Sequence, residues 1–285
     1  MRKHFKHIET MKNILIPILL SVSAAVSVQA QEPAQYRITY DCDALFGETR
    51  KVYRWALDVG TQTAVFYSPN NRAKEDLIDD VVRTDDVNVV MARIRSSKSL
   101  YPNANPLEVL VKAAPVGRYT YLNKINSDRM WYEEKLPAMD WETTERDTTV
   151  CGYTCFQARA SVYGRTWTVW FAPEIPAPYG PYLLGGLPGL ILDAEDADGL
   201  FHFTAVGLEQ APTDATVELS GIKDAIKCQR KKFLSLRDQA NGQSLNESLR
   251  ALNLGDNAVV RVVSENGEEL DPNTEMPKKN YLDLK

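Results

Sequence analysis

Most of the chain alternates hydrophobic and polar residues with a period of two, which is the pattern of strands that bury one face. The alternating segments are rich in aromatic and β-branched residues, and short polar or glycine-containing turns separate them. We predict strands over residues 36–42, 50–60, 63–68, 87–95, 117–125, 129–136, 139–150, 151–171 (two strands joined at Gly164-Arg165), 190–196 and 200–209.

Three segments depart from this alternation. Residues 70–80 (NNRAKEDLIDD) are polar and predict a loop. Residues 105–113 predict a short helix, with Asn105 as its cap and Pro106 as its first residue. The clearest helix covers 221–240, where hydrophobic residues recur at helical spacing. The stripe consists of Ile222, Ile226, Phe233, Leu236 and Ala240.

The count of elements sets the fold class. About ten strands joined by short turns, with one clear helix, predict a β-rich α+β fold. We expect a large curved antiparallel sheet or open half-barrel with one or two packed helices. Residues 31–285 are long enough to form a single domain, with a polar tail from about residue 265.

The first thirty residues have the organisation of a signal peptide. A basic start precedes an apolar run from Ile14 to about Val28, and small residues follow before Gln31. The run is short for a membrane span, although an uncleaved anchor is the alternative. Either Met1 or Met11 is the start. No cysteine lies near the cut, so we expect an exported mature chain, periplasmic or secreted, without a lipid anchor or transmembrane segment.

Removing the leader changes the charge and the histidine count. It carries four basic residues against one acidic residue, so the formal net charge goes from −5 to −8. An acidic chain with scattered lysines is a poor binder of nucleic acid. His202 is then the one remaining histidine, which excludes any site that needs two.

Four cysteines remain in the mature chain: Cys42, Cys151, Cys155 and Cys228. Export implies an oxidising compartment, so we expect one or two disulfides, with the pairing open. An extended segment would hold Cys151 and Cys155 too far apart to bridge directly. A zinc site of four thiolates is the alternative, but no CxxC pair supports it. We therefore expect neither a metal site nor a cofactor.

A glycine-rich stretch, GGLPGLIL (185–192), invites comparison with phosphate-binding loops. It lacks the Gly-Lys-Ser/Thr of a Walker loop, and a strand rather than a helix follows it. Residues 187–190 instead fit a type II turn, with Pro188 at the second position and Gly189 at positive φ. The stretch predicts a tight turn into a buried strand. The motif residues are Gly186, Leu187, Pro188, Gly189, Leu190 and Ile191.

The remaining candidate chemistry is weak. DAEDADG (193–199) is acidic, but Ala194 and Ala205 stand where an EF-hand needs acids, so a solvated hairpin turn is favoured over a looser calcium loop. His202 should face solvent between Phe201 and Phe203, and no GxSxG elbow accompanies it. A hydrolase with two carboxylates stays open, because such a pair is spatial and not sequential.

Aromatic residues gather around the proline-rich segment 172–182. Beside an arginine they can form a platform for a ligand or a partner, or they can be a packing cluster. The candidates for a ligand or partner surface are Arg165, Trp167, Trp170, Tyr179 and Tyr182.

Several motifs together resemble the GLPGLI family of secreted bacterial proteins. GLPGLIL is the family's signature, and further motifs occur in the same order. They are FYS (66–68), GYTCFQA (152–158), YGRTWTVWF (163–171), PEIP (173–176), GP (180–181) and the closing NYLDLK. The resemblance implies export and a β-rich fold, but it transfers no active site. The layout is also similar to the half-barrel of periplasmic lipoprotein carriers, an analogy of fold alone.

These observations favour a non-enzymatic envelope protein that binds an apolar ligand, a peptide or an envelope partner. The alternatives are a carboxylate-based hydrolase and a structural subunit of an envelope assembly. Export, the large sheet and the Trp/Tyr/Pro segment support the first of these.

Overall fold

The computed structural model describes residues 32–82, 87–241, 243–244, 271 and 278–283. All of them fall within one compact unit, residues 31–285. The predicted leader, residues 1–30, lies outside the described residues, as does most of the polar tail.

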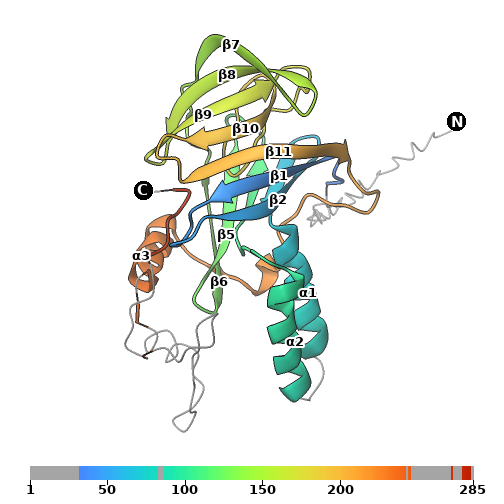
Figure 1. The fold of residues 1–285 in the computed structure, drawn as a ribbon, viewed down its shortest axis with the longest axis vertical. Coiled ribbons are helices and arrows are strands. Elements are labelled where there is room, and N and C mark those ends of the chain that lie inside the picture. Colours follow the sequence, from blue (N-terminus) through green and yellow to red (C-terminus); the bar gives the residue numbers. More distant parts are fainter. Residues whose placement is uncertain (1–31, 83–86, 242, 245–270, 272–277, 284–285) are drawn as a thin grey trace, which may run out of the picture. The chain divides into compact units, whose positions relative to one another are not determined.

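One large curved sheet dominates this unit (Figure 1). Its strand order is β12-β6-β5-β4-β3-β2-β1-β11-β10-β9-β8-β7. Every neighbouring pair is antiparallel except β12 and β6, which are parallel. The strands are β1 (Tyr36–Ala44), β2 (Lys51–Val59), β3 (Thr63–Tyr67), β4 (Glu108–Lys112), β5 (Arg118–Ile125), β6 (Asp128–Lys135), β7 (Glu142–Val150), β8 (Tyr153–Val162), β9 (Arg165–Ala172), β10 (Leu190–Asp196), β11 (Phe201–Gln210) and β12 (Ile226–Lys227).

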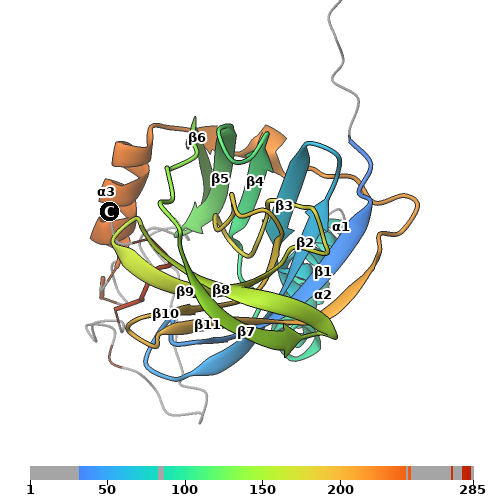
Figure 2. The ribbon, with the colours of Figure 1, turned by 90° about the horizontal axis from the view of Figure 1, so that it is seen from above.

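The sheet curves so that β3–β6 form one flank and β7–β11 the other (Figure 2). β7 and β12 are its two edges, so it is not a closed barrel. The prediction of a β-rich α+β fold with a large curved sheet is therefore confirmed. The period-two pattern that predicted the strands corresponds to burial in the structure, where alternate residues of β1 and β11 face the core. They are Ile38, Tyr40, Cys42, Ala44, Phe201, Phe203 and Ala205.

Two predictions before residue 100 were wrong. Residues 70–80 form part of helix α1 (Pro69–Val82), and 87–95 form part of α2 (Val87–Leu100), not a strand. Ser68 and Pro69 are the residues at which α1 begins, and they could have predicted it. Proline is favoured at the first helical position, and the Ser68 hydroxyl accepts the backbone N–H of Asn71 at 3.4 Å. The helices pack against each other (Figure 1), and such contacts outweigh the strand propensity of valine and isoleucine.

Two further predictions need correction. Residues 105–113 were predicted as a short helix but contain strand β4. The Asn105 side chain accepts the backbone N–H of Leu107 at 3.0 Å, which closes a local turn before the strand instead of capping a helix. The long helix predicted at 221–240 is shorter: only α3 (Arg230–Ala240) is α-helical. Before it, η1 (Ile222–Asp224) follows Gly221 at φ 64°, and β12 pairs with β6.

Candidate functional site

The segment between β9 and β10 folds back into the curve of the sheet, where it shares a cavity with residues of β2, β3 and β4. Its proline residues prevent a helix, so its backbone forms single hydrogen bonds to neighbours instead. The Ile191 N–H donates to the carbonyl oxygen of Tyr179, and the Gly186 N–H donates to that of Pro178, both at 3.0 Å. The indole N–H of Trp141 donates to the carbonyl oxygen of Gly185 at 2.9 Å. These bonds fix residues 178–186 in one conformation.

The structure corrects the predicted role of Gly189. It does not adopt positive φ; in this segment Tyr182, at 58°, and Gly186, at 86°, do so. Gly189 is required because the backbone of β9 passes over it. A Cβ atom there would overlap the carbonyl oxygen of Ala172 and lie 2.8 Å from the Cα of Pro173. Leu190 and Ile191 then begin the buried strand β10, as the motif predicted.

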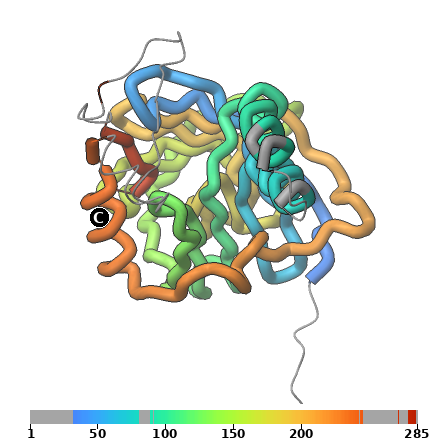
Figure 3. The backbone as a smooth tube through the Cα atoms, turned by 90° about the horizontal axis from the view of Figure 1, so that it is seen from below, coloured from blue at the N-terminus to red at the C-terminus, as the bar shows by residue number. Residues whose placement is uncertain are grey.

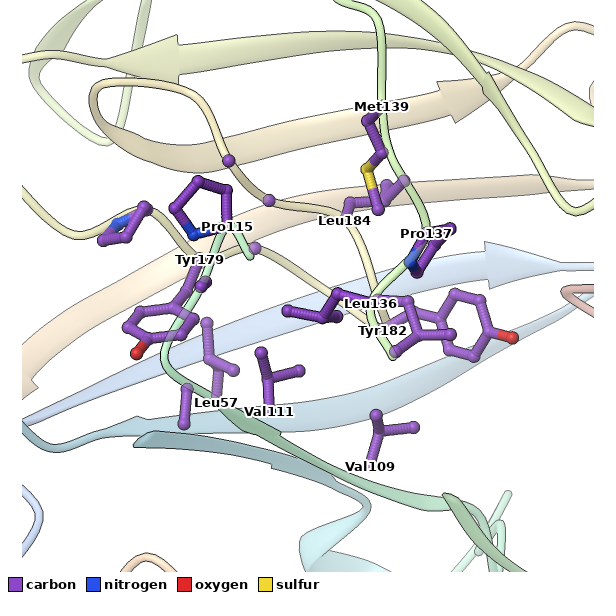
Figure 4. Close-up of a pocket in the computed structure, with 17 residues that line it drawn as sticks. Leu57, Val109, Val111, Pro115, Leu136, Pro137, Met139, Tyr179, Tyr182 and Leu184 are labelled. Carbon is purple, nitrogen blue, oxygen red and sulfur yellow. The ribbon is translucent and has the colours of Figure 1, made fainter. Parts of the chain in front are cut away.

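A cavity of about 60 Å³ lies between this segment and the sheet (Figure 4). Its lining residues share one property: none of those described carries a charge. The strands supply Leu57, Ala64, Val109 and Val111; two loops supply Ala114, Pro115, Leu136, Pro137 and Met139; the segment supplies Pro178, Tyr179, Gly180, Tyr182, Leu183, Leu184, Gly185 and Gly186.

Sequence patterns could not identify this cavity as a whole. Val109 and Val111 fell in a predicted helix, and Leu136 and Met139 follow β6 without any motif. The curvature of the sheet brings these residues together over long sequence separations. The glycine- and proline-rich segment was the one local signal.

Tyr182 is unusual among the lining residues. It is 2% exposed, it adopts φ 58°, and its hydroxyl has no hydrogen-bond partner among the described residues. Burial raises the pKa of this hydroxyl well above its usual value, so it stays protonated. Figure 4 shows the hydroxyl groups of Tyr179 and Tyr182 pointing away from the other labelled side chains, so the cavity receives their ring carbons.

The five predicted surface residues do not meet on one exposed face. Trp167 is fully buried in the core, and Arg165 is 2% exposed. Trp170 is partly buried against that core. Only Tyr179 and Tyr182 line the cavity. The role in ligand or partner binding therefore stays a prediction, and of the five residues Tyr179 and Tyr182 are the ones placed at a cavity.

The hydrogen bonds of Arg165 are made within the protein and support its fold. Its guanidinium donates to Asp196 at 2.8 Å and twice to the carbonyl oxygen of Tyr281, at 2.7 and 3.0 Å. Asp196 in turn accepts the backbone N–H groups of Leu200 and Phe201, both at 2.7 Å. The acidic hairpin considered for calcium thus uses its buried carboxylate to fix the turn and to hold the C-terminal segment.

His202 faces outward between two buried phenylalanines, as predicted. Its Nε2 atom lies 3.0 Å from Asp193, and this hydrogen bond raises the pKa of the imidazole above 6.5. Thr204 donates to the same carboxylate at 2.8 Å and lies 3.4 Å from the same Nε2. A nucleophile–His–acid triad needs the two ring nitrogens on different partners, so this cluster lacks that geometry.

Each buried carboxylate in the described part of the chain is matched with a basic side chain, the arrangement of a structural ion pair. The pairs are Asp58–Arg37, Glu75–Lys124, Glu108–Arg72, Asp196–Arg165 and Asp283–Arg237.

The predicted disulfides are absent: all four cysteines are free thiols in the structure. They lie on different elements of the fold. Cys42 is buried on β1, Cys155 is buried on β8, Cys151 is exposed in the turn before β8, and Cys228 follows β12. The Cys151 thiol donates to the carbonyl oxygen of Ala205 at 2.8 Å.

Among the described residues, no group of three or more His, Cys, Asp or Glu residues could hold a metal ion. No helix among them is long and apolar enough to cross a membrane.

Comparisons with known proteins indicate the fold alone. No family model and no curated protein matches the chain. Two structures of PNGF-II, in space groups C2 and P21, each align with a TM-score of 0.51 and 13% identity. The alignments cover 74% and 81% of this chain but 34% and 38% of PNGF-II, so the chain spans little more than a third of that protein.

A more distant structure is a domain described as an outer membrane lipoprotein-sorting protein, from Vibrio parahaemolyticus. It has a TM-score of 0.25 and 8% identity over 62% of this chain and 85% of that domain. This similarity is too low to support any inference about function. The GLPGLI resemblance therefore rests on the sequence motifs alone.

Proposed function

We propose that the mature chain is an exported, non-enzymatic binding module whose apolar cavity accepts one aliphatic side chain of an extended envelope partner. The observation that carries this proposal is the lining of the cavity, where apolar side chains meet glycine and proline backbone without any charge. Burial of an apolar group there is favourable, whereas burial of an uncompensated polar group is costly.

The size of the cavity limits which groups can occupy it. At about 60 Å³ it is well below the ~150 Å³ of an engineered cavity that binds benzene. It suits a leucine- or isoleucine-sized group rather than a lipid chain or a drug-sized ligand, which need about 300 Å³ or more. A partner peptide would supply such a group together with backbone contacts outside the cavity.

The test compares two fluorescent seven-residue peptides of glycine and serine that differ only in a central leucine or asparagine. These side chains have similar size and opposite polarity. We expect the leucine peptide to bind about tenfold more tightly, because leucine burial is worth about 1.5 kcal/mol or more. Equal affinities in fluorescence polarisation would refute the proposed function.

Ala64→Val tests the location of the binding site. Ala64 is buried on β3 and lines the cavity, and valine suits a strand. We expect the variant to be more stable by about 1 kcal/mol, because it fills empty space, and to lose the preference for leucine.

The control is Ala92→Val on the exposed surface of α2, which should keep the leucine preference. If Ala64→Val destabilised the protein and kept the preference, the cavity would not be the binding site.

A further inference from the structure

A second cavity, of about 290 Å³, lies between β5, α3 and the C-terminal residues 279–282. It shares no described lining residue with the apolar cavity. Figure 3 shows the C-terminal segment, in red, beside α3, in orange. Its volume approaches the lower end of the range for small-molecule sites, about 300 Å³.

The charged residues that line this cavity are all basic. They are Lys124, Arg237 and Lys279, and no aspartate or glutamate lines it among the described residues. Lys124 pairs with Glu75, outside the lining, at 2.8 Å. Arg237 is 6% exposed and sits deepest of the three, with its guanidinium 2.8 Å from Asp283 outside the lining set. Lys124 and Arg237 each reach the cavity paired with a carboxylate, and the exposed Lys279 is the lining cation that a bound anion would meet most directly.

Aromatic rings make up much of the remaining wall. They are Phe46, Tyr53, Tyr121, Phe233 and Tyr281. Several are held in place by ring contacts: Phe46 meets Tyr53 edge-on at 4.9 Å, and Tyr121 meets Phe233 edge-on at 5.3 Å. Rings fixed in this way offer flat apolar surfaces at little entropic cost.

The C-terminal segment completes the cavity and is held from two sides. The backbone of Lys279 exchanges hydrogen bonds with the side chain of Asn241, which follows α3, at 2.7 and 3.2 Å. Asn280 bonds the carbonyl oxygens of Leu45 and Phe46 at 2.6 and 2.7 Å. The wall that carries Lys279 and Tyr281 is therefore a defined part of the fold.

We propose that this cavity binds a small molecule that joins one anionic group to a flat apolar ring. The cations receive the carboxylate, sulfonate or phosphate, and the rings and aliphatic residues cover the ring of the ligand. The site is additional to the function proposed for the apolar cavity and does not depend on it.

Isothermal titration calorimetry in 0.15 M salt tests the proposal with the mature chain. The probes are naphthalene-1-sulfonate and the cation 1-naphthylmethylammonium, which share a ring system and differ in charge. We expect the sulfonate to bind at sub-millimolar concentration and the cation to bind at least tenfold more weakly. No binding of the sulfonate up to 5 mM (about −3 kcal/mol), or equal binding of both probes, overturns the proposal.

A pair of neighbouring lysines gives a matched control. Lys279 lines the cavity, whereas Lys278 is also exposed and does not line it. We expect Lys279→Glu to weaken sulfonate binding by about fivefold or more, and Lys278→Glu to change it less than about twofold. Equal losses in the two variants would mean diffuse surface attraction and would overturn the proposal.

Filling the cavity provides a second variant. Ala240 lines it from the last residue of α3. Ala240→Phe should abolish sulfonate binding, with an unchanged melting temperature as the check on folding. Ala64→Val, in the other cavity, should leave sulfonate binding unchanged. Retained binding in a folded Ala240→Phe variant overturns the proposal.

Discussion

At the scale of single residues, the glycine–proline motif was predicted correctly as a structural device but for the wrong reason. The pattern Leu-Pro-Gly-Leu predicted positive φ at Gly189, whereas the structure requires a missing Cβ there. The local sequence indicates which backbone conformations a residue prefers. It cannot indicate that the backbone of another strand, ending at Ala172, lies directly against Gly189.

We expect Gly189→Ala to destabilise the fold by about 3 kcal/mol, because the new methyl group overlaps the backbone of Ala172 and that backbone cannot move cheaply. Chemical denaturation measures the loss. Gly47→Ala is the matched control, since nothing lies within 4 Å of its Cβ position, and it should change stability by less than about 0.5 kcal/mol. Equal effects of the two substitutions would disprove the close-approach explanation.

His202 should make stability depend on pH. Its folded-state pKa is raised by the hydrogen bond to Asp193, so protonation favours the folded state. The contribution is complete below the unfolded pKa of about 6.5 and is lost as pH rises through the higher folded value. An NMR titration should place the imidazole midpoint above 6.5, and Asp193→Asn should lower it. A midpoint below 6.5 would contradict the observed pair.

At the scale of elements, strands were predicted better than helices. A strand needs only period two, and the buried faces of β1 and β11 follow it closely. α1 and α2 were missed because polar residues hid the first and β-branched residues resembled a strand in the second. The two helices pack mainly against each other, and the periodicity of one segment cannot reveal such a tertiary contact.

The C-terminal segment behaves as an element although it is neither helix nor strand. Its motif NYLDLK was noted in the sequence without a role. In the structure it supplies Asp283, which is 1% exposed and pairs with Arg237 and Arg230 at 2.8 and 3.3 Å. The carbonyl oxygen of Tyr281 accepts two hydrogen bonds from Arg165.

We expect Asp283→Asn to lower the free energy of unfolding by about 3 kcal/mol, because Arg237 then loses its buried carboxylate partner. Asp238→Asn is the control: Asp238 contacts the same guanidinium at 3.4 Å but is 67% exposed, so its loss should cost less than about 1 kcal/mol. Thermal or urea unfolding measures both. If Asp283→Asn were neutral, the segment would not anchor the fold.

At the scale of the whole unit, the curvature of one sheet brings together residues that are far apart in the sequence. The flanks meet where Tyr119 of β5 and Tyr163, in the turn before β9, share a hydrogen bond of 2.8 Å. Arg230 of α3 stacks 4.3 Å above the Tyr163 ring. The sequence predicted a curved, open sheet, but not which residues would line its interior, because those contacts span most of the chain. Fold class was therefore predictable, and the candidate site largely was not.

The central claim is that an aliphatic side chain of a partner enters the cavity beneath residues 178–186. The most direct measurement is NMR of leucine- and valine-methyl-labelled protein with the leucine peptide, read as intermolecular nuclear Overhauser effects. We expect contacts from the peptide leucine to the methyl groups of Leu57, Val111 and Leu184, and their loss in Ala64→Val. Contacts confined to leucines and valines outside this lining would contradict the claim.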